Sequence, residues 1–321
     1  LSRCLSSLLT ARFPSMDSLG DALRQDGGEC ELLIIDNAPT DARTREIVEQ
    51  TTGARYVCEP IAGLNFARNR AVAEAKGFLV AFLDDDTVVD PYWAIGLANA
   101  FSTYPRAGGF TGNVLPFELQ TQAQVIFEAS GGFGRGFSRI HFGPRLLGNR
   151  LYPCGAGIFG AGCNMAFRRD LILELGGFDE ALDTGRPLPG GGDLDMFYRV
   201  VRSGNSIVYE PTFLVFHQHR RQLAELRRQY ESWGRGFMAY VSKSMNTDPE
   251  MRSIFRELVR WWWFHQASRL KESFGGRPFL TWSMVMAEMW GGAKGILGEY
   301  RRSQQRIEKL KQETLNAVSS N

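Results

Sequence analysis

Paired cysteines, a strong excess of one charge and long uncharged apolar runs are all missing from this sequence. The five cysteines stand at positions 4, 30, 58, 154 and 163, are odd in number and form no CxxC pair. We therefore expect neither a disulfide framework nor a zinc-binding cysteine cluster, and a reducing compartment suits the chain. No signal peptide is visible, and because the sequence begins at a Leu rather than a Met, we expect its true N-terminus to be missing.

The charge balance is close to neutral, with 37 Lys and Arg against 35 Asp and Glu and a net charge of +2. A dedicated nucleic-acid binder usually carries a large basic excess, so we expect no nucleic-acid partner. Apolar residues make up 44% of the chain and charged residues 22%, which predicts a packed core rather than disorder. The length of 321 residues fits two domains or one large α/β domain.

No segment is apolar enough to predict a helix that spans a membrane. The best window, residues 279–298, contains Glu288, Lys294 and four glycines. An aromatic cluster at residues 261–264 follows two arginines, and it has two interpretations. It packs helices together in the core, or it forms an interfacial patch that touches a membrane surface.

Short apolar runs alternate with helical patterns through the first half of the chain. The chain opens with leucines at helical spacing, and Pro91 stands at the favoured first turn of a helix that runs to about residue 102. Strands are predicted at 31–36, 55–58 and 78–83, with helices at 41–51 and 65–76. This alternation predicts parallel βαβ units in a layered α/β domain. Residues 115–155 are rich in Gly and aromatic residues, and we expect long loops with short elements there, which determine substrate specificity.

Regular patterns return after residue 160 and change character near residue 222. We predict a strand at 163–169, a helix at 170–176, a glycine-rich loop and helix at 190–204, and strands at 207–211 and 213–219. Three helices follow, at 221–243, 250–272 and 280–315, the last mostly solvated with a thin apolar stripe. We therefore expect an α/β domain over residues 1–221 and a helical C-terminal region over residues 222–321.

Three consecutive carboxylates, Asp84, Asp85 and Asp86, directly follow an apolar strand. They repel one another, and a strand end offers nothing to neutralise them, whereas a bound divalent cation would. Oxygen ligands at the carboxyl edge of a sheet suit Mg²⁺ or Mn²⁺, and ligands bind at this edge of open α/β sheets. A solvated acidic turn is the alternative. An EF-hand loop does not fit, because it needs Asp at alternate positions and then Gly, and a DxDxT motif does not fit, because Val88 replaces the required Thr.

Other carboxylates and a histidine pair are further candidates. Asp36 ends a predicted strand and is either a binding-site carboxylate or a turn residue. Asp193 and Asp195 follow three glycines at a helix start, where capping is the alternative role. Residues two apart do not share a helix face, so at most one of the two points into a site. His217 and His219 share one face of a predicted strand, as a structural pair or as metal ligands.

Gly155, Gly157 and Gly160 match the GxGxxG pattern of dinucleotide-binding proteins. That pattern works only between a strand and the helix that it opens. Here a predicted loop precedes it and a predicted strand follows, so we expect a hinge or a close-packed loop. An oxidoreductase built on this pattern would also leave the Asp84–Asp86 triplet unexplained.

Taken together, six segments in the family's order resemble a family 2 glycosyltransferase of the GT-A fold: residues 32–41, 63–77, 81–93, 160–180, 190–204 and 209–221. The resemblance implies an α/β GT-A domain with a mostly parallel sheet. It implies an inverting transfer of a sugar from a nucleotide-diphosphate sugar to an acceptor hydroxyl, with Mn²⁺ or Mg²⁺ as cofactor. The acceptor would be a glycan, a lipid-linked molecule or another hydroxyl compound in polysaccharide or glycoconjugate synthesis. The expected location is cytoplasmic, with peripheral contact of the helical tail at the inner face of the membrane.

The resemblance also implies roles for single residues on the donor side. Asp36 corresponds to the acidic residue that contacts the nucleotide base, and Arg68 lies in the segment that approaches the nucleotide. Within the triplet, Asp84 is similar to the family's ribose-side carboxylate, and Asp85 is placed with it at the nucleotide sugar.

A second group of residues would hold the metal and carry the proton transfer. Asp86 is similar to the family's metal ligand, and His217 to the histidine that completes the metal and diphosphate site. Asp193 corresponds to the general base that activates the acceptor hydroxyl, with a fixed orientation at the helix N-cap. Asp195 is expected to point away and to pair with Arg199 at i+4.

The sequence departs from the family pattern at three places. Gly192 stands where members usually have an acidic residue before the base, so Asp195 stays an alternative to Asp193. The family's first strand is absent, and its loss from the middle of the sheet is expected to open a gap beside the site. The (Q/R)xxRW motif is also absent, which favours transfer of one or a few sugars over polymerisation. A non-catalytic relative that binds nucleotide sugars or glycans is the alternative function.

Overall fold

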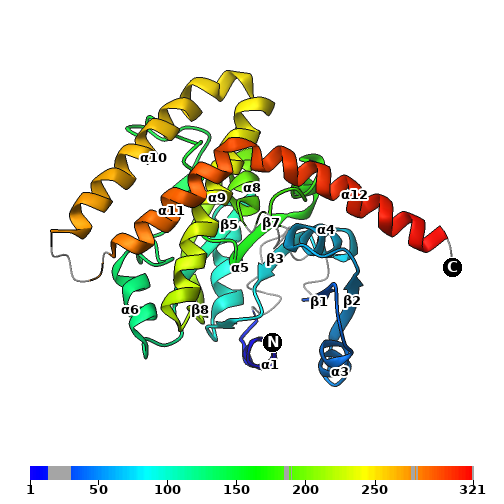
Figure 1. Cartoon of the computed structure of the whole chain (residues 1–321). Coiled ribbons are helices and arrows are strands. Elements are labelled where there is room, and N and C mark those ends of the chain that lie inside the picture. The colour runs from blue at the N-terminus through cyan, green and yellow to red at the C-terminus, as the bar shows by residue number, and fades with distance from the viewer. Residues whose placement is uncertain (14–29, 184–187, 189, 276–278, 280, 320–321) are drawn as a thin grey trace.

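The computed structural model describes residues 1–13, 30–183, 188, 190–275, 279 and 281–319. Its strands form two sheets, and in Figure 1 the smaller one stands apart from the larger. The smaller sheet pairs β1 (Leu32–Asn37) with β2 (Ala54–Glu59) in parallel. The larger has six strands in the order β3–β7–β5–β8–β4, with β6 paired to β8. Its strands are β3 (Leu79–Leu83), β4 (Thr87–Val89), β5 (Gly109–Pro116), β6 (Ile140–Phe142), β7 (Asn164–Arg168) and β8 (Ile207–His217).

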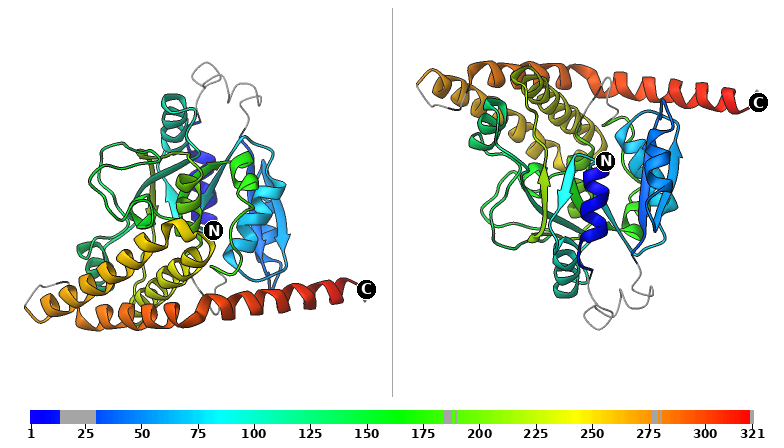
Figure 2. Two further views of the ribbon diagram at one scale, coloured as in Figure 1. Left: turned by 90° about the horizontal axis from the view of Figure 1, so that it is seen from above. Right: turned by 90° about the horizontal axis from the view of Figure 1, so that it is seen from below.

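Helices precede, connect and follow these strands. The α/β part contains α1 (Ser2–Thr10), α3 (Arg43–Glu49), α4 (Leu64–Glu74), α5 (Trp93–Thr103), α6 (Gln122–Ala129), α7 (Arg169–Glu174), α8 (Gly192–Arg202) and the short η2 (Ala156–Ile158). The C-terminal region contains α9 (Leu223–Thr247), η3 (Pro249–Met251), α10 (Arg252–Ser273), α11 (Trp282–Lys294), η4 (Gly295–Glu299) and α12 (Tyr300–Ser319). Residue 280, the first of the last predicted helix, lies outside the described residues. Figure 2 shows that α9–α12 gather on one side of the α/β part.

The predicted α/β class is confirmed, but the expectation of a mostly parallel sheet is wrong. Among the described strands, β1–β2 and β5–β8 pair in parallel, whereas β3–β7, β4–β8, β5–β7 and β6–β8 are antiparallel. Alternation predicts parallel strands only where a helix crosses between two neighbours, as α3 does between β1 and β2. The loop-rich region after β5 returns the chain to the larger sheet without such a simple crossover.

One local prediction also needs correction. The two strands expected at the end of the α/β part are one continuous strand, β8, whose pairing with β5 shifts register between Gly112 and Asn113. Pro211 lies at this irregularity. The short elements expected among the loops of residues 115–155 include α6 and β6.

The gap expected in the sheet is visible between the two sheets. Within the described residues, no strand joins β1 to β3, the edge strand of the larger sheet. Helix α1 lies between them instead (Figure 2). On one side of α1, Leu5 packs with Ile34 and Val48 in the layer of the smaller sheet. On the other side, the Ser7 hydroxyl of α1 accepts a hydrogen bond of 3.1 Å from the Val89 N–H of β4.

The largest hydrophobic cluster includes side chains from both halves of the chain. Phe167 and Phe197 of the α/β part pack in one cluster with Tyr240 of α9 and Phe255 of α10. The C-terminal helices therefore complete the core of the α/β part from one face. In the described part of the chain, no helix combines the length and apolar character that crossing a bilayer requires.

Candidate active site

The Asp84–Asp86 triplet forms a tight turn between β3 and β4. The Asp84 carbonyl accepts hydrogen bonds from the Thr87 N–H at 3.2 Å and from the Thr87 hydroxyl at 2.6 Å. Asp85 is exposed at the tip of this turn, while Asp84 and Asp86 are partly buried. The turn therefore directs two of the three carboxylates toward the ends of neighbouring strands.

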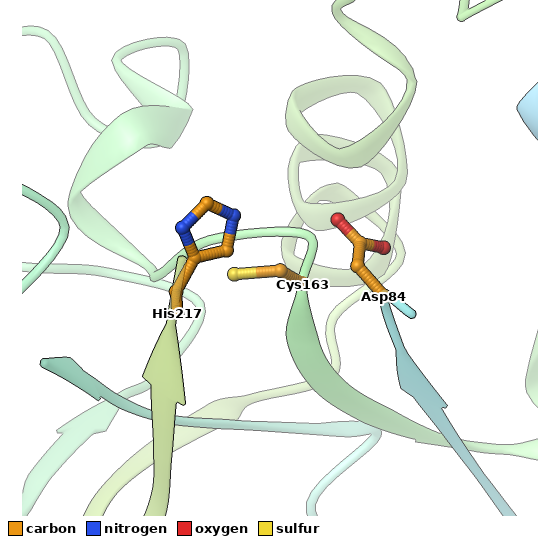
Figure 3. Close-up of side chains that lie close together, drawn as sticks. All are labelled: Asp84, Cys163 and His217. Carbon is orange, nitrogen blue, oxygen red and sulfur yellow. The ribbon is translucent and has the colours of Figure 1, made fainter. Parts of the chain in front are cut away.

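Asp84 meets two side chains from other strand ends, as Figure 3 shows. Ligand atoms of Asp84, Cys163 and His217 all lie within 4.8 Å of one another. Cys163 directly precedes β7 and His217 ends β8, so three strand ends converge at one edge of the sheet. Burial raises the pKa of Asp84 to about 6, although the nearby Arg68 opposes this shift. Burial also raises the pKa of the Cys163 thiol. The sequence did not point to Cys163 as a site residue. Nothing set it apart from the other cysteines except its position in the segment 160–180.

Asp86 carries the clearest sign of a cation site. Its Oδ1 atom is buried and accepts no hydrogen bond, although it lies 3.4 Å from His217 Nε2. Buried carboxylate oxygens without a partner are rare, because leaving one unpaired is energetically costly. A hard carboxylate oxygen beside an imidazole nitrogen is a donor set that suits Mn²⁺. The residues present therefore fit the divalent cation that the resemblance implies.

His217 and His219 contact each other, as expected from their spacing. Their Nδ1 atoms are 3.0 Å apart, and His219 Nε2 lies 2.7 Å from Glu128 Oε1 on α6. Burial lowers the pKa of His217 to about 3. His217 is therefore neutral near pH 7, as a metal ligand must be. Glu128 had no signal in the sequence, since α6 lies in the region of weak periodicity that was predicted to hold long loops with short elements.

Arg68 is buried on α4 and connects that helix to the segment before α8. Its guanidinium donates to Asp183 Oδ2 at 3.0 Å and to Asn65 Oδ1 at 3.1 Å. Asp183 has a left-handed backbone with φ of 55° and also accepts the Gly192 N–H at 3.0 Å. Burial raises the pKa of Asp183 to about 6, against the lowering effect of Arg68. The sequence had suggested a nucleotide contact for Arg68 but gave no indication of this ion pair.

The two acids of α8 point to different surroundings. Asp193 Oδ2 accepts the Gly162 N–H at 3.1 Å, and its Oδ1 accepts the Leu194 N–H at 2.8 Å. Asp195 is buried and forms ion pairs with Arg199, at 2.8 Å, and with Lys243 of α9. The expected divergence of these acids and the Asp195–Arg199 pair are confirmed.

The expected place of Asp193 at the helix N-cap is wrong. The N-cap residue of α8 is Gly191, whose φ of 100° lies in a region that glycine adopts readily. Asp193 therefore sits inside the first turn of the helix. Its carboxylate is held by backbone N–H groups of Gly162 and Leu194 rather than by the cap geometry.

Asp36 lies at the carboxyl end of β1, on the smaller sheet. Its Oδ2 atom accepts a hydrogen bond of 2.9 Å from the Tyr56 hydroxyl. The neighbouring Asn37 side chain ties β1 to the segment before α4, because it accepts the Gly63 N–H and donates to the Ile61 carbonyl. A cavity of about 330 Å³ opens beside Asp36 and is lined by residues 36–41, 43 and 44. Asp36 and the triplet thus stand on different sheets.

The GxGxxG segment is a close-packed loop, as expected. It contains η2 and leads into β7, so no helix follows it as a nucleotide-binding turn would require. A Cβ atom at Gly160 would lie 2.6 Å from the Cβ of Thr111, which explains why only glycine fits there.

Comparisons with known proteins agree with this architecture. The family model described as Glycosyl transferase family 2 matches residues 16–176, half of the chain. A pre-mycofactocin glycosyltransferase of Mycobacterium tuberculosis is 26% identical over 159 residues, covering 50% of this chain and 31% of that protein. A glucosyl-dolichyl phosphate glucuronosyltransferase of Haloferax volcanii is 26% identical over 132 residues, covering 39% and 36%. The chain spans about a third of the length of these curated relatives.

A solved structure is similar over most of its length. The mannosyltransferase PcManGT from Pyrobaculum calidifontis, in complex with GDP-Man and Mn²⁺, superposes with a TM-score of 0.54. The two chains are 16% identical, and the similarity covers 89% of this chain and 85% of the other. At this identity the likeness shows the fold, and it confirms the predicted GT-A architecture.

We predict that Asp195 stabilises the fold. The change Asp195→Asn leaves the buried Lys243 ammonium without its closest carboxylate, and breaking such a pair typically costs about 3 kcal/mol of unfolding free energy. Urea denaturation measures this loss. The matched change Asp170→Asn breaks an exposed pair with Arg168 and should cost under about 1 kcal/mol. Equal losses in the two variants would contradict a structural role for Asp195.

Proposed function

The chain belongs to glycosyl transferase family 2, and we propose on that premise that it transfers a sugar from a nucleotide-diphosphate sugar to an acceptor hydroxyl with inversion. One observation carries the proposal. Asp84, Asp86 and His217 meet at the edge of the larger sheet, while another carboxylate, Asp193, stands outside this cluster. That arrangement provides separate groups for binding a cation and for accepting a proton. PcManGT, which binds GDP-Man and Mn²⁺, supports the same two classes of ligand for this fold.

The cation would be held by Asp86 and His217, with Asp84 close enough to be a further ligand. When bound, Mn²⁺ or Mg²⁺ supplies positive charge that stabilises the leaving nucleoside diphosphate. The buried, unpartnered Oδ1 of Asp86 supports this assignment. Asp85, exposed at the tip of the turn, would contact the nucleotide sugar.

The nucleoside would lie across the two sheets. Asp36 and its cavity of about 330 Å³ offer a carboxylate acceptor for the base. The positive charge of Arg68 opposes the rise in the pKa of Asp84, and a hydrogen bond to Asp183 holds the Arg68 side chain. Arg68 therefore places positive charge between the two sheets. These positions support the donor-side roles that the resemblance implies for Asp36, Arg68 and Asp84.

Asp193 would act as the general base. Two backbone N–H groups fix its carboxylate, which leaves lone pairs available for a substrate hydroxyl. The acceptor oxygen attacks the anomeric carbon as the bond to the diphosphate breaks, and its proton passes to Asp193. A positioned base of this kind typically contributes about 10²–10⁴ in rate.

The base assignment predicts a loss of turnover in Asp193→Asn. The amide oxygen keeps the hydrogen bond from Gly162, but the side chain no longer accepts a proton. We expect kcat to fall at least about a hundredfold, with donor affinity little changed, in an assay of donor consumption. Asp195→Asn should lose far less turnover once its stability loss is allowed for. A reversed order would transfer the role of base to Asp195.

The cation assignment predicts that Mn²⁺ stabilises the folded protein. A ligand at about a hundred times its dissociation constant adds about 2.7 kcal/mol to the unfolding free energy, which thermal denaturation detects. Asp86→Ala should lose both this stabilisation and donor turnover while keeping the fold, because it removes no core packing. Asp85→Ala should keep the Mn²⁺ stabilisation. Full activity in a chelator would overturn the cation assignment, and donor binding without consumption would favour the non-catalytic alternative.

A second proposal concerns contact between the C-terminal helices and a membrane surface. Several large apolar side chains of α10 and α11 are exposed, including Phe264 at 78% and Trp290 at 59%. Trp282, Met286 and Trp290 recur at every fourth position of α11, so they share one exposed face. Lys294 follows on that face, 4.9 Å from the Trp290 ring. Aromatic and basic side chains together are typical of interfacial helices.

This proposal predicts binding to vesicles that contain anionic lipid. In a flotation assay, we expect the protein to float with such vesicles and the double variant Trp282→Ser, Trp290→Ser to float much less. Phe137→Ser removes an even more exposed aromatic side chain from the α/β part and should change nothing. If the unmodified protein stays at the bottom of the gradient, the membrane proposal is wrong.

A further inference from the structure

A line of polar contacts runs from α6 to the triplet behind the candidate cation site. Glu128 Oε1 lies 2.7 Å from His219 Nε2, His219 Nδ1 lies 3.0 Å from His217 Nδ1, and His217 Nε2 lies 3.4 Å from Asp86 Oδ1. The side chains of His217 and His219 are both buried. Each contact in this line restricts which nitrogen of the neighbouring histidine ring carries a proton.

The proton positions follow from the Glu128 end. A carboxylate only accepts hydrogen bonds, so a neutral His219 carries its proton on Nε2 and presents a lone pair on Nδ1. The contact between the two Nδ1 atoms requires one proton, which His217 must therefore provide from its own Nδ1. This leaves the Nε2 atom of His217 unprotonated, with its lone pair free.

The Asp86 end of the line agrees with this assignment. Asp86 Oδ1 is buried and accepts no hydrogen bond, so the 3.4 Å contact with His217 Nε2 is not one in which the ring donates. Two electron-pair donors thus face each other with no proton between them. A cation held between the two atoms would account for this pairing.

The surroundings hold both rings in place. Phe133 packs at ring-centroid distances of 5.2 Å from His217 and 5.9 Å from His219, and Phe127 packs edge-on against His219 at 4.6 Å. Helix α6, which carries Glu128, begins with a capping box formed by Thr121 and Gln124. The line is therefore built from ordered elements rather than from exposed side chains that rotate freely.

We propose that Glu128 and His219 are positioning residues, which hold His217 in the tautomer whose Nε2 atom binds the divalent cation. The inference rests on the proposed cation site and adds two residues to it, neither of which contacts the cation. Groups behind a metal-binding histidine commonly fix its tautomer, and their removal typically weakens metal binding about 10- to 100-fold.

Titration with Mn²⁺ followed by calorimetry tests the proposal without any assay of turnover. His219→Phe keeps the ring volume but removes the acceptor for His217, and it should weaken Mn²⁺ binding about 10- to 100-fold. His219→Asn offers an amide oxygen near the position of Nδ1 and should restore much of the affinity. Glu128→Ala should weaken binding in the same direction as His219→Phe.

A matched variant separates this effect from a simple loss of negative charge. Glu118→Ala removes a neighbouring carboxylate that contacts Gln124, Gln218 and Arg221 but not His219, so Mn²⁺ affinity should stay close to that of the unmodified protein. Thermal denaturation of each variant without metal identifies any that fail to fold. Equal affinities in folded His219→Phe, Glu128→Ala and unmodified protein would overturn the proposal while leaving the cation site intact.

Nitrogen NMR of the metal-free protein tests the tautomer directly. We expect His217 to carry its proton on Nδ1 in the unmodified protein and to lose that preference in His219→Phe. A proton on Nε2 of His217 in the unmodified protein would overturn the proposal. Failure of the unmodified protein to bind Mn²⁺ would instead overturn the cation site itself, and the proposal with it.

Discussion

The crowding of buried carboxylates around one arginine is the constraint on which the candidate site depends. The charge of Arg68 lowers the pKa of Asp84 and of Asp183, whereas the nearby charge of Asp193 raises both. Burial raises the pKa of Asp84 and of Asp183 to about 6, because a single guanidinium does not offset the loss of solvation of several carboxylates. Such an excess of negative charge is most stable when a further cation enters. This charge imbalance supports the proposed cation site.

The same arginine helps to hold two separate sheets together. Helix α4 packs on the smaller sheet, while Arg68 reaches Asp183 beside α8. Helix α12 adds a second bridge, since Ile307 packs with Phe66 of α4 and the Tyr300 hydroxyl donates to Asp179 at 2.7 Å. Together with α1, these helices span the interruption in the sheet. The C-terminal region therefore contributes to the geometry of the site as well as to the core.

Asp193 and Asp195 lie two residues apart in α8 and have different surroundings, one facing the candidate site and the other an ion-pair network within the fold. Asp195 is surrounded by Lys243 and Arg199, so its charge is balanced within the fold. Asp193 accepts hydrogen bonds from two neutral backbone N–H groups, and its carboxylate is the group proposed to accept a proton. Helical geometry alone requires this division, because side chains at i and i+2 point about 200° apart.

The sequence by itself determined the α/β class, most of the strands and helices, the triplet at the end of β3 and the opposite directions of Asp193 and Asp195. These features follow from local periodicity and from residue types at strand and helix ends. Only the tertiary structure decided the strand directions, the N-cap at Gly191 and the partners Cys163, Asp183 and Glu128. Each of those partners is distant in sequence from the residue it contacts, and no local pattern encodes a contact that depends on how distant strands and helices pack.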